Sequence, residues 1–191
     1  MQQAAARSRS RQALRSLLLA LTVGCSPING GPPPVALPDD FRQDFGVNHT
    51  TVPLPDSIGI EDALYYRRAV GERSELHVTG GFVLGYSIFP YTMFGYRRYL
   101  IDRPGRTLGL EVQLSPPIVA EVAVPMAFQL PGRSLFLTAH PSVGLTYMGV
   151  VNLPVGLTWQ PRPRLQIHNA LGARLGGNNY AYWSTGVSVP F

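Results

Sequence analysis

The sequence contains no lysine, so all sixteen of its basic residues are arginines. This absence excludes Schiff-base chemistry on a lysine and the lysine of phosphate-binding loops. Four arginines, Arg7, Arg9, Arg11 and Arg15, lie near the N-terminus, and the rest of the chain is close to neutral. The remaining arginines are scattered and stand mostly at turn signals. We therefore expect no nucleic-acid partner, because a clustered basic surface is missing.

Cysteine and histidine are also scarce. Cys25 is the sole cysteine, so an intrachain disulfide is impossible. The four histidines, His49, His77, His140 and His168, are far apart and show no metal-ligand spacing. We predict neither a metal site nor a cofactor.

The N-terminus has the pattern of an export signal. Basic residues precede a short apolar run, 17–23, which is too short to cross a bilayer as a helix and ends at Gly24-Cys25. We predict a signal peptide over 1–24. The run Leu21-Thr22-Val23-Gly24-Cys25 resembles a bacterial lipobox, which implies a lipid on Cys25 as the first mature residue. Thr22 departs from that pattern, which usually has Leu, Val or Ile there. The alternative is an ordinary signal with Cys25 incidental.

Residues 25–45 are rich in proline and glycine, including Pro32-Pro33-Pro34. Such a segment cannot build a core, so we predict an extended tether. The remaining residues, 46–191, form the predicted folded domain.

That domain shows no helical period and many short alternating segments. Four tight-turn signals, each containing arginine together with glycine or proline, recur roughly thirty residues apart. They are 71–73, 103–106, 131–133 and 160–164, and candidate connections at the opposite end lie near 89–91, 115–117, 147–149 and 176–179. Each interval then holds two strands of about ten to twelve residues, long enough to cross a bilayer when tilted.

Several strands have one apolar and one polar face. Leu108, Leu110, Val112 and Leu114 alternate with Thr107, Gly109, Glu111 and Gln113, and 165–174 alternates similarly. The pairs Arg67-Arg68 and Arg97-Arg98 place an arginine on both faces, so one of each should lie near a rim or mark a bulge. Our candidates for a polar network inside a barrel are Glu111, Glu121, His168 and Arg174.

The last strand, 180–191, alternates and ends on an aromatic residue. It resembles the C-terminal strand of bacterial outer-membrane β-barrels. That resemblance implies an all-β, up-and-down antiparallel barrel of about ten strands, with eight as the alternative because Pro53 and Pro55 weaken the first strand. It also implies outer-membrane lipid and the assembly machinery as partners, and both termini with the tight turns in the periplasm. Trp183, Val187, Val189 and Phe191 would face lipid and form the assembly signal.

We therefore expect a non-catalytic outer-membrane barrel with a structural, envelope or loop-mediated binding role. A barrel of eight to ten strands is too narrow for an open aqueous channel. A secreted, surface-tethered soluble β-sandwich that binds a ligand is one alternative. A lipid A deacylase-like enzyme is another, but Ala170 stands where the serine nucleophile would follow His168, with Ser184 on the next strand.

Overall fold

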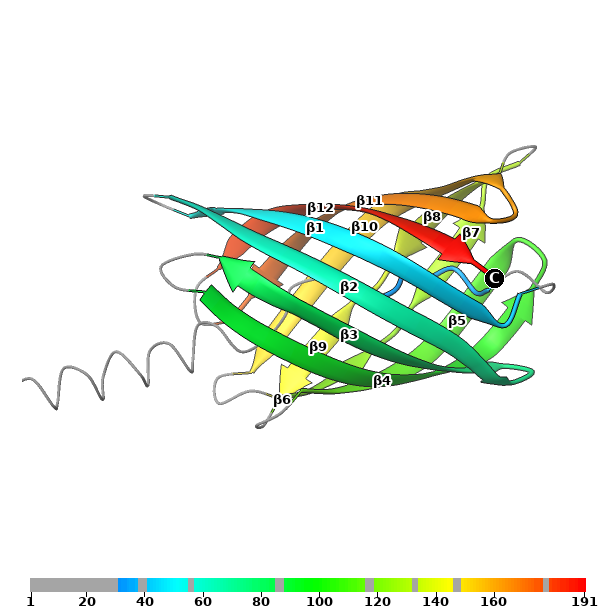
Figure 1. Cartoon of the computed structure of the whole chain (residues 1–191), viewed down its shortest axis with the longest axis horizontal. Helices are drawn as coiled ribbons and strands as arrows, with labels where there is room; N and C mark the ends of the chain where they lie inside the picture. The colour runs from blue at the N-terminus through cyan, green and yellow to red at the C-terminus, as the bar shows by residue number, and fades with distance from the viewer. Residues whose placement is uncertain are drawn as a thin grey trace, which may run out of the picture.

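Antiparallel strands follow one another around a closed ring in the described part of the chain (Figure 1). The computed structural model describes residues 31–37, 41–54, 57–84, 88–115, 119–131, 134–145, 149–176 and 179–191. No helix in these ranges is long and apolar enough to cross a membrane. The strands are β1 (Gln43–Leu54), β2 (Ser57–Gly71), β3 (Ser74–Leu84), β4 (Ile88–Arg103), β5 (Arg106–Ser115), β6 (Val119–Ala123), β7 (Met126–Gln129), β8 (Leu135–Ala139), β9 (Ser142–Leu145), β10 (Val150–Arg162), β11 (Leu165–Leu175) and β12 (Tyr180–Pro190).

These twelve segments make ten strands of a barrel, because two strands are interrupted by proline. β6 and β7 both pair with β5, and β8 and β9 both pair with β10. Pro125 and Pro141 stand at the two interruptions, where a residue without an N–H cannot donate to the ladder. Pro154 in β10 lies opposite the second break, and its carbonyl accepts a bond from the His140 N–H at 3.2 Å.

The ring closes between the first and last strands. β1 pairs with β12 from Asp44↔Pro190 to Thr51↔Trp183. Gln43 and Phe191 exchange two backbone hydrogen bonds, at 3.1 and 2.9 Å, so the terminal residue belongs to the closing ladder. The predicted ten-stranded antiparallel barrel is confirmed, and Pro53 is accommodated in β1 opposite Ile58.

The connections are short at both ends of the barrel. The predicted tight turns join β2 to β3, β4 to β5, β7 to β8 and β10 to β11 at the end where Phe191 also lies, which we call the turn end. At the opposite end the gaps between strands, 55–56, 85–87, 116–118, 146–149 and 176–179, hold two to four residues. The connection predicted near 89–91 was misplaced, because Phe89, Pro90 and Tyr91 pair with β3 inside β4.

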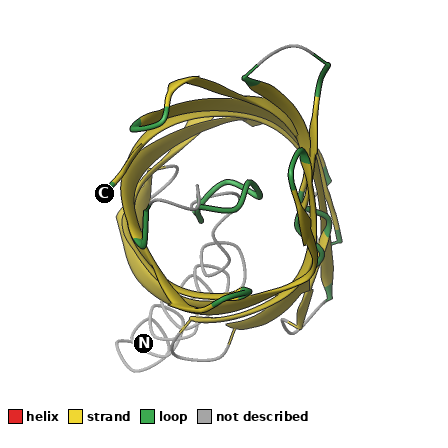
Figure 2. Ribbon diagram, turned by 90° about the vertical axis from the view of Figure 1, so that its right-hand side faces the viewer, coloured by secondary structure: helices red, strands yellow, loops and turns green. Residues whose placement is uncertain are grey.

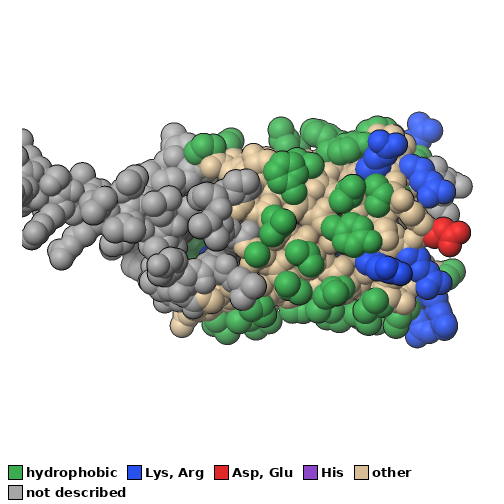
Figure 3. Space-filling view, turned by 90° about the horizontal axis from the view of Figure 1, so that it is seen from below, with side chains coloured by type: hydrophobic (Ala, Val, Ile, Leu, Met, Phe, Trp, Pro, Cys, Tyr) green, Lys and Arg blue, Asp and Glu red, His purple; other side chains and the backbone are tan. Residues whose placement is uncertain are grey.

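The two faces of the wall differ in chemistry. Side chains that alternate outward are mostly apolar, and Figure 3 shows them spread over the barrel surface with arginines gathered at one end. Eight arginines are exposed at the turn end: Arg42, Arg68, Arg73, Arg98, Arg103, Arg106, Arg162 and Arg164. Arg67 and Arg97 point inward while Arg68 and Arg98 point outward, and a register shift follows each pair at Ala69/Gly71 and Tyr99/Ile101. The barrel interior therefore holds the polar groups that position the candidate site.

Candidate functional site

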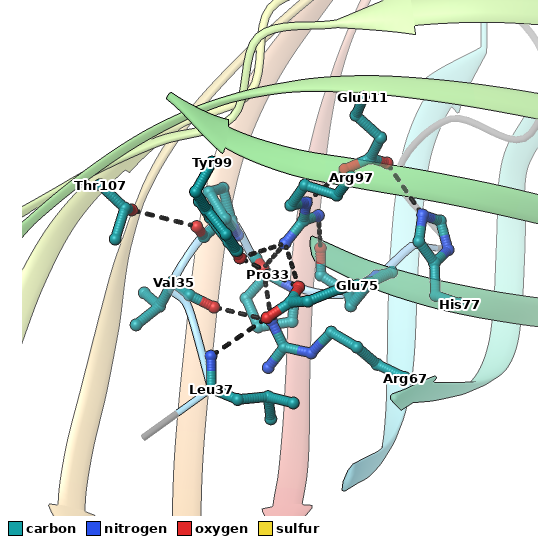
Figure 4. Close-up of polar contacts among 12 residues, drawn as sticks. Pro33, Val35, Leu37, Arg67, Glu75, His77, Arg97, Tyr99, Thr107 and Glu111 are labelled. Atoms are coloured by element: carbon teal, nitrogen blue, oxygen red, sulfur yellow. Dashed lines mark hydrogen bonds and ion pairs between the residues drawn. The ribbon is translucent and has the colours of Figure 1, made fainter. Parts of the chain in front are cut away.

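A segment from the N-terminal region lies inside the barrel. Residues 31–37, which we call the lumen strap, lie inside the ring of strands (Figure 2), and their carbonyl groups face side chains of β2, β4 and β5 (Figure 4). Pro32, Pro33 and Val35 are buried. This arrangement differs from the extended tether predicted over 25–45. Residues 31–37 are held within the lumen, and β1 begins at Gln43. Prolines favour an extended backbone, and inward polar groups supply the partners that fix it in place.

Arg97 and Glu111 form the centre of the polar interior. Arg97 Nε donates to Glu111 Oε2 at 2.5 Å, and both side chains are fully buried. His77 Nε2 lies 3.1 Å from Glu111 Oε1, His140 Nε2 lies 3.5 Å from Oε2, and Gln113 donates a further hydrogen bond to this carboxylate. Such a buried carboxylate needs several partners, because its desolvation is otherwise costly.

A second ion pair lies beside the first, nearer the turn end. Arg67 NH2 donates to Asp44 Oδ2 at 2.7 Å, and NH1 lies 3.5 Å from Glu75 Oε2. Glu75 also accepts a hydrogen bond from the Tyr99 hydroxyl at 3.0 Å, and Arg97 NH1 lies 3.6 Å away. Two arginines and three carboxylates from five strands are therefore joined through shared contacts around the strap.

The strap carbonyls accept hydrogen bonds from both arginines. Arg97 NH1 donates to the Pro33 carbonyl at 2.8 Å and NH2 to that of Pro32 at 3.2 Å. Arg67 NH1 donates to the Val35 carbonyl at 2.7 Å. Further strap contacts are Asn48 Nδ2 to Gly31 O at 2.7 Å, Thr107 Oγ1 to Pro34 O at 3.4 Å, and Leu37 N to Glu75 Oε1 at 3.2 Å.

All four residues proposed for the interior lie buried on the inner face, but they do not form one cluster. Glu111 belongs to the ion-pair cluster around the strap, which is built on Asp44, Arg67, Glu75, Arg97 and Glu111. Glu121 is on β6, 3.4 Å from Asn152 Nδ2, and His168 Nε2 contacts Asn48 Oδ1. Arg174 lies nearer the end opposite the turn end, with its Cζ atom 5.9 Å from the ring centroid of Tyr180. The interior thus has several separate polar groups along its length.

The sequence candidates did not include most residues of the ion-pair cluster around the strap, namely Asp44, Arg67, Glu75, His77, Arg97 and Tyr99. Of these, Arg67, Glu75 and Arg97 contact the strap itself. A usable signal existed for five of the six. The signal is spacing by two residues, which places side chains on one face of a strand. Arg67 follows Ala63 and Tyr65 in this way on β2, and Glu75 and His77 precede Thr79 on β3. Arg97 and Tyr99 share a face of β4 for the same reason. Asp44 fell in the segment that we had assigned to the tether, so its place on β1 could not be read from alternation.

The geometry around His168 also bears on the deacylase alternative. Ala170 pairs with Ser184 across β11 and β12, and His168 pairs with Gly186, all on the inner face. His168 Nε2 contacts Asn48, and the Ser184 hydroxyl has no hydrogen-bond partner among the described side chains. No three His, Cys, Asp or Glu residues in the described ranges are grouped to hold a metal ion.

The residues predicted to face lipid lie on the outer face of β12 and at its end. Trp183 is 50% exposed and Phe191 is 55% exposed, and Val187 and Val189 are likewise exposed. Their role as an assembly signal stays a prediction. Cys25 and the signal peptide lie outside the described residues, so lipidation also stays a prediction.

Comparison with known proteins gives structural likeness at low sequence identity. No protein-family model and no curated protein matches the sequence. The N-terminal β-barrel domain of Pseudomonas aeruginosa OprF is 11% identical over 79% of this chain and 99% of that domain, with a TM-score of 0.38. Ail of Yersinia pestis is 11% identical over 78% and 97%, with a TM-score of 0.37. The phycobiliprotein lyase CPES from Guillardia theta is 8% identical over 79% and 88%, with a TM-score of 0.44. These values do not assign the chain to a family.

Proposed function

We propose that this chain is an exported bacterial outer-membrane barrel, non-catalytic and closed at rest, that serves a structural role in the envelope and carries a lipid on Cys25. The observation that carries the membrane placement is the inverted wall. In the described residues, thirty-one large apolar side chains are exposed, whereas ten apolar residues are buried. These side chains are 36–69% exposed, so each Leu, Val or Phe would gain roughly half of the about 1.5–3 kcal/mol that full burial gives, and this surface favours a hydrocarbon environment.

The turn end has the chemistry of a membrane interface. Tyr66 and Tyr96 are exposed and donate hydrogen bonds to Gln43 and Ser74 near the rim, and the exposed arginines lie beyond them. Aromatic rings and arginines suit the headgroup region, where the arginines can bind lipid phosphates. We place this end, with the C-terminus, at the periplasmic leaflet, as the resemblance of the last strand implies.

The closed interior supports a structural role over conduction in the resting state. The lumen strap and the paired charges fill the turn half of the barrel. The loop-mediated binding role receives less support, because the connections opposite the turns hold only two to four residues. Outer-membrane barrels that bind through loops present longer segments there.

Fractionation of cells that express the full chain tests this proposal. We expect the protein in the outer membrane, extracted only by detergent, with faster gel mobility before heating than after it. Mass spectrometry should find a lipid on the mature N-terminal Cys25. The matched variant Cys25→Ser should lose that mass yet remain in the membrane, because the apolar belt holds it there. A variant that becomes soluble would instead support a soluble barrel held at the membrane by its lipid.

A further inference from the structure

We infer that the lumen strap is a displaceable plug, and that its departure opens a narrow water-filled path for small hydrated ions. The inference rests on the membrane placement proposed above. It changes the expectation that a barrel of this size is too narrow to conduct. The lumen accommodates a polypeptide segment with Pro32, Pro33 and Val35 buried in it, so the wall itself encloses room for a chain.

The strap is held differently from every strand of the wall. Within the described ranges it makes no backbone–backbone hydrogen bond with a strand, and its contacts are with side chains. Three consecutive prolines remove N–H donors, so the strap offers mainly carbonyl oxygens. Hydrogen bonds from side chains to carbonyls can be exchanged for hydrogen bonds to water at little net cost.

The charges of the wall are paired without the strap. Arg97 is bound to Glu111 at 2.5 Å and Arg67 to Asp44 at 2.7 Å, and Tyr99 donates to Glu75. The strap contributes no charged side chain to these contacts, so its departure breaks no ion pair. Leaving a buried charge without its partner is the step that would make displacement prohibitive, and this geometry avoids it.

The surface uncovered by the strap is polar and wettable. A cavity of about 30 Å³ already lies between the strap and the wall near His140, Thr158 and His168, with room for water. Around the strap, the three carboxylates Asp44, Glu75 and Glu111 outnumber the two arginines. We therefore expect the vacated path to prefer cations over anions.

Single-channel recording on the full chain in planar lipid bilayers tests the inference. The wild type should insert and remain closed apart from rare openings. A variant of equal length, with Pro32→Gly, Pro33→Ser, Pro34→Gly and Val35→Ser, loses the stiff extended backbone and the buried valine. We expect sustained, cation-preferring current from it. A free peptide with the sequence of residues 31–37 and blocked ends should reduce that current when added to the bath.

The matched control makes comparable changes in exposed turns, Pro131→Ser and Pro163→Gly, and should stay closed. A second variant, Asn48→Ala with Thr107→Val, removes two strap contacts and the Asn48–His168 contact but leaves the ion pairs in place, so openings should become about tenfold more frequent. The inference fails if the strap variant keeps its heat-modifiable mobility and inserts but remains silent. It also fails if the strap variant and the second variant both fail to fold, since the strap is then an obligatory part of the core. A wild type that is soluble and never inserts would instead contradict the membrane placement.

Discussion

The two faces of the same ten strands place opposite demands on their side chains. On β2, Leu64 points outward and is 54% exposed, while Arg67, three residues away, points inward and is fully buried. A soluble barrel would reverse this arrangement, with aliphatic side chains inside. In the proposed membrane placement, hydrocarbon covers the apolar outer face and paired charges occupy the inner face, so the two faces should respond oppositely to charged substitutions.

The largest effect should come from removing one charge of the inner face. Arg97→Met leaves Glu111 buried without its arginine partner and should lower the free energy of unfolding by about 3–5 kcal/mol. Urea unfolding in lipid vesicles, followed by the heat-modifiable gel shift, measures this loss. Arg98→Met, one residue away on the exposed face, is the control and should change the same quantity by less than about 0.5 kcal/mol.

A second substitution distinguishes the cost of the unpaired Glu111 charge from the other effects of removing Arg97. Arg97→Met combined with Glu111→Gln removes both charges and should recover a large part of the lost stability. If the double variant is as unstable as Arg97→Met alone, the cost lies in the lost packing or in the lost strap contacts. In that case the matched-charge view of the inner face is wrong.

A charge placed on the outer face should have the next largest effect. Leu64→Arg puts a guanidinium near the middle of β2 against hydrocarbon, at a cost of about 2–4 kcal/mol. Val70→Arg, near the rim, should cost about 0–1 kcal/mol because the side chain can reach the headgroups. Equal stability losses at the two positions would contradict a bilayer around the barrel, because only a bilayer makes the cost depend on depth.

Much of the wall could be predicted because alternation and turns are local signals. The row from Leu108 to Leu114 gives the facing of β5, and each proline or glycine turn gives the end of a hairpin. Glu111 could be placed inside for the same reason. The connection near Phe89 was misplaced because Pro90 suggests a turn, whereas the structure accommodates it within β4 opposite Phe82.

The strap and its binding cluster could not be predicted because they depend on contacts between distant residues. Pro33 and Arg97 are 64 residues apart, and nothing in a proline run indicates which surface it will contact. A flexible tether and a bound strap have the same composition. Only the hydrogen bonds from side chains of the wall to the strap carbonyls distinguish them. The partners of Arg67 likewise depend on the register between β1, β2 and β3, which a single strand does not reveal.

Space inside the lumen should be less sensitive than charge but still measurable. Gly46 faces Tyr65 across β1 and β2, and a Cβ at Gly46 would meet the tyrosine ring. Gly46→Ala should therefore cost about 1–3 kcal/mol through overpacking. Gly80→Ala on β3 is the matched control, since no atom lies within 4 Å of its Cβ position. Urea unfolding in the same vesicles compares the free energies of unfolding of the two variants. If Gly46→Ala loses as little as Gly80→Ala, the lumen accommodates the added methyl group without overpacking.

A similarly modest effect on stability should come from the last residue, although its effect on assembly should be large. Deleting Phe191 removes two backbone hydrogen bonds with Gln43 and one outward aromatic ring, so the refolded barrel should lose about 1–3 kcal/mol. If the assembly machinery reads this end, the membrane-inserted fraction in cells should fall far more than that loss explains. Phe191→Leu keeps the backbone bonds and an apolar side chain, and it separates the two roles. Full insertion of the deleted protein in cells would show that the terminal residue closes the ladder without acting as a signal.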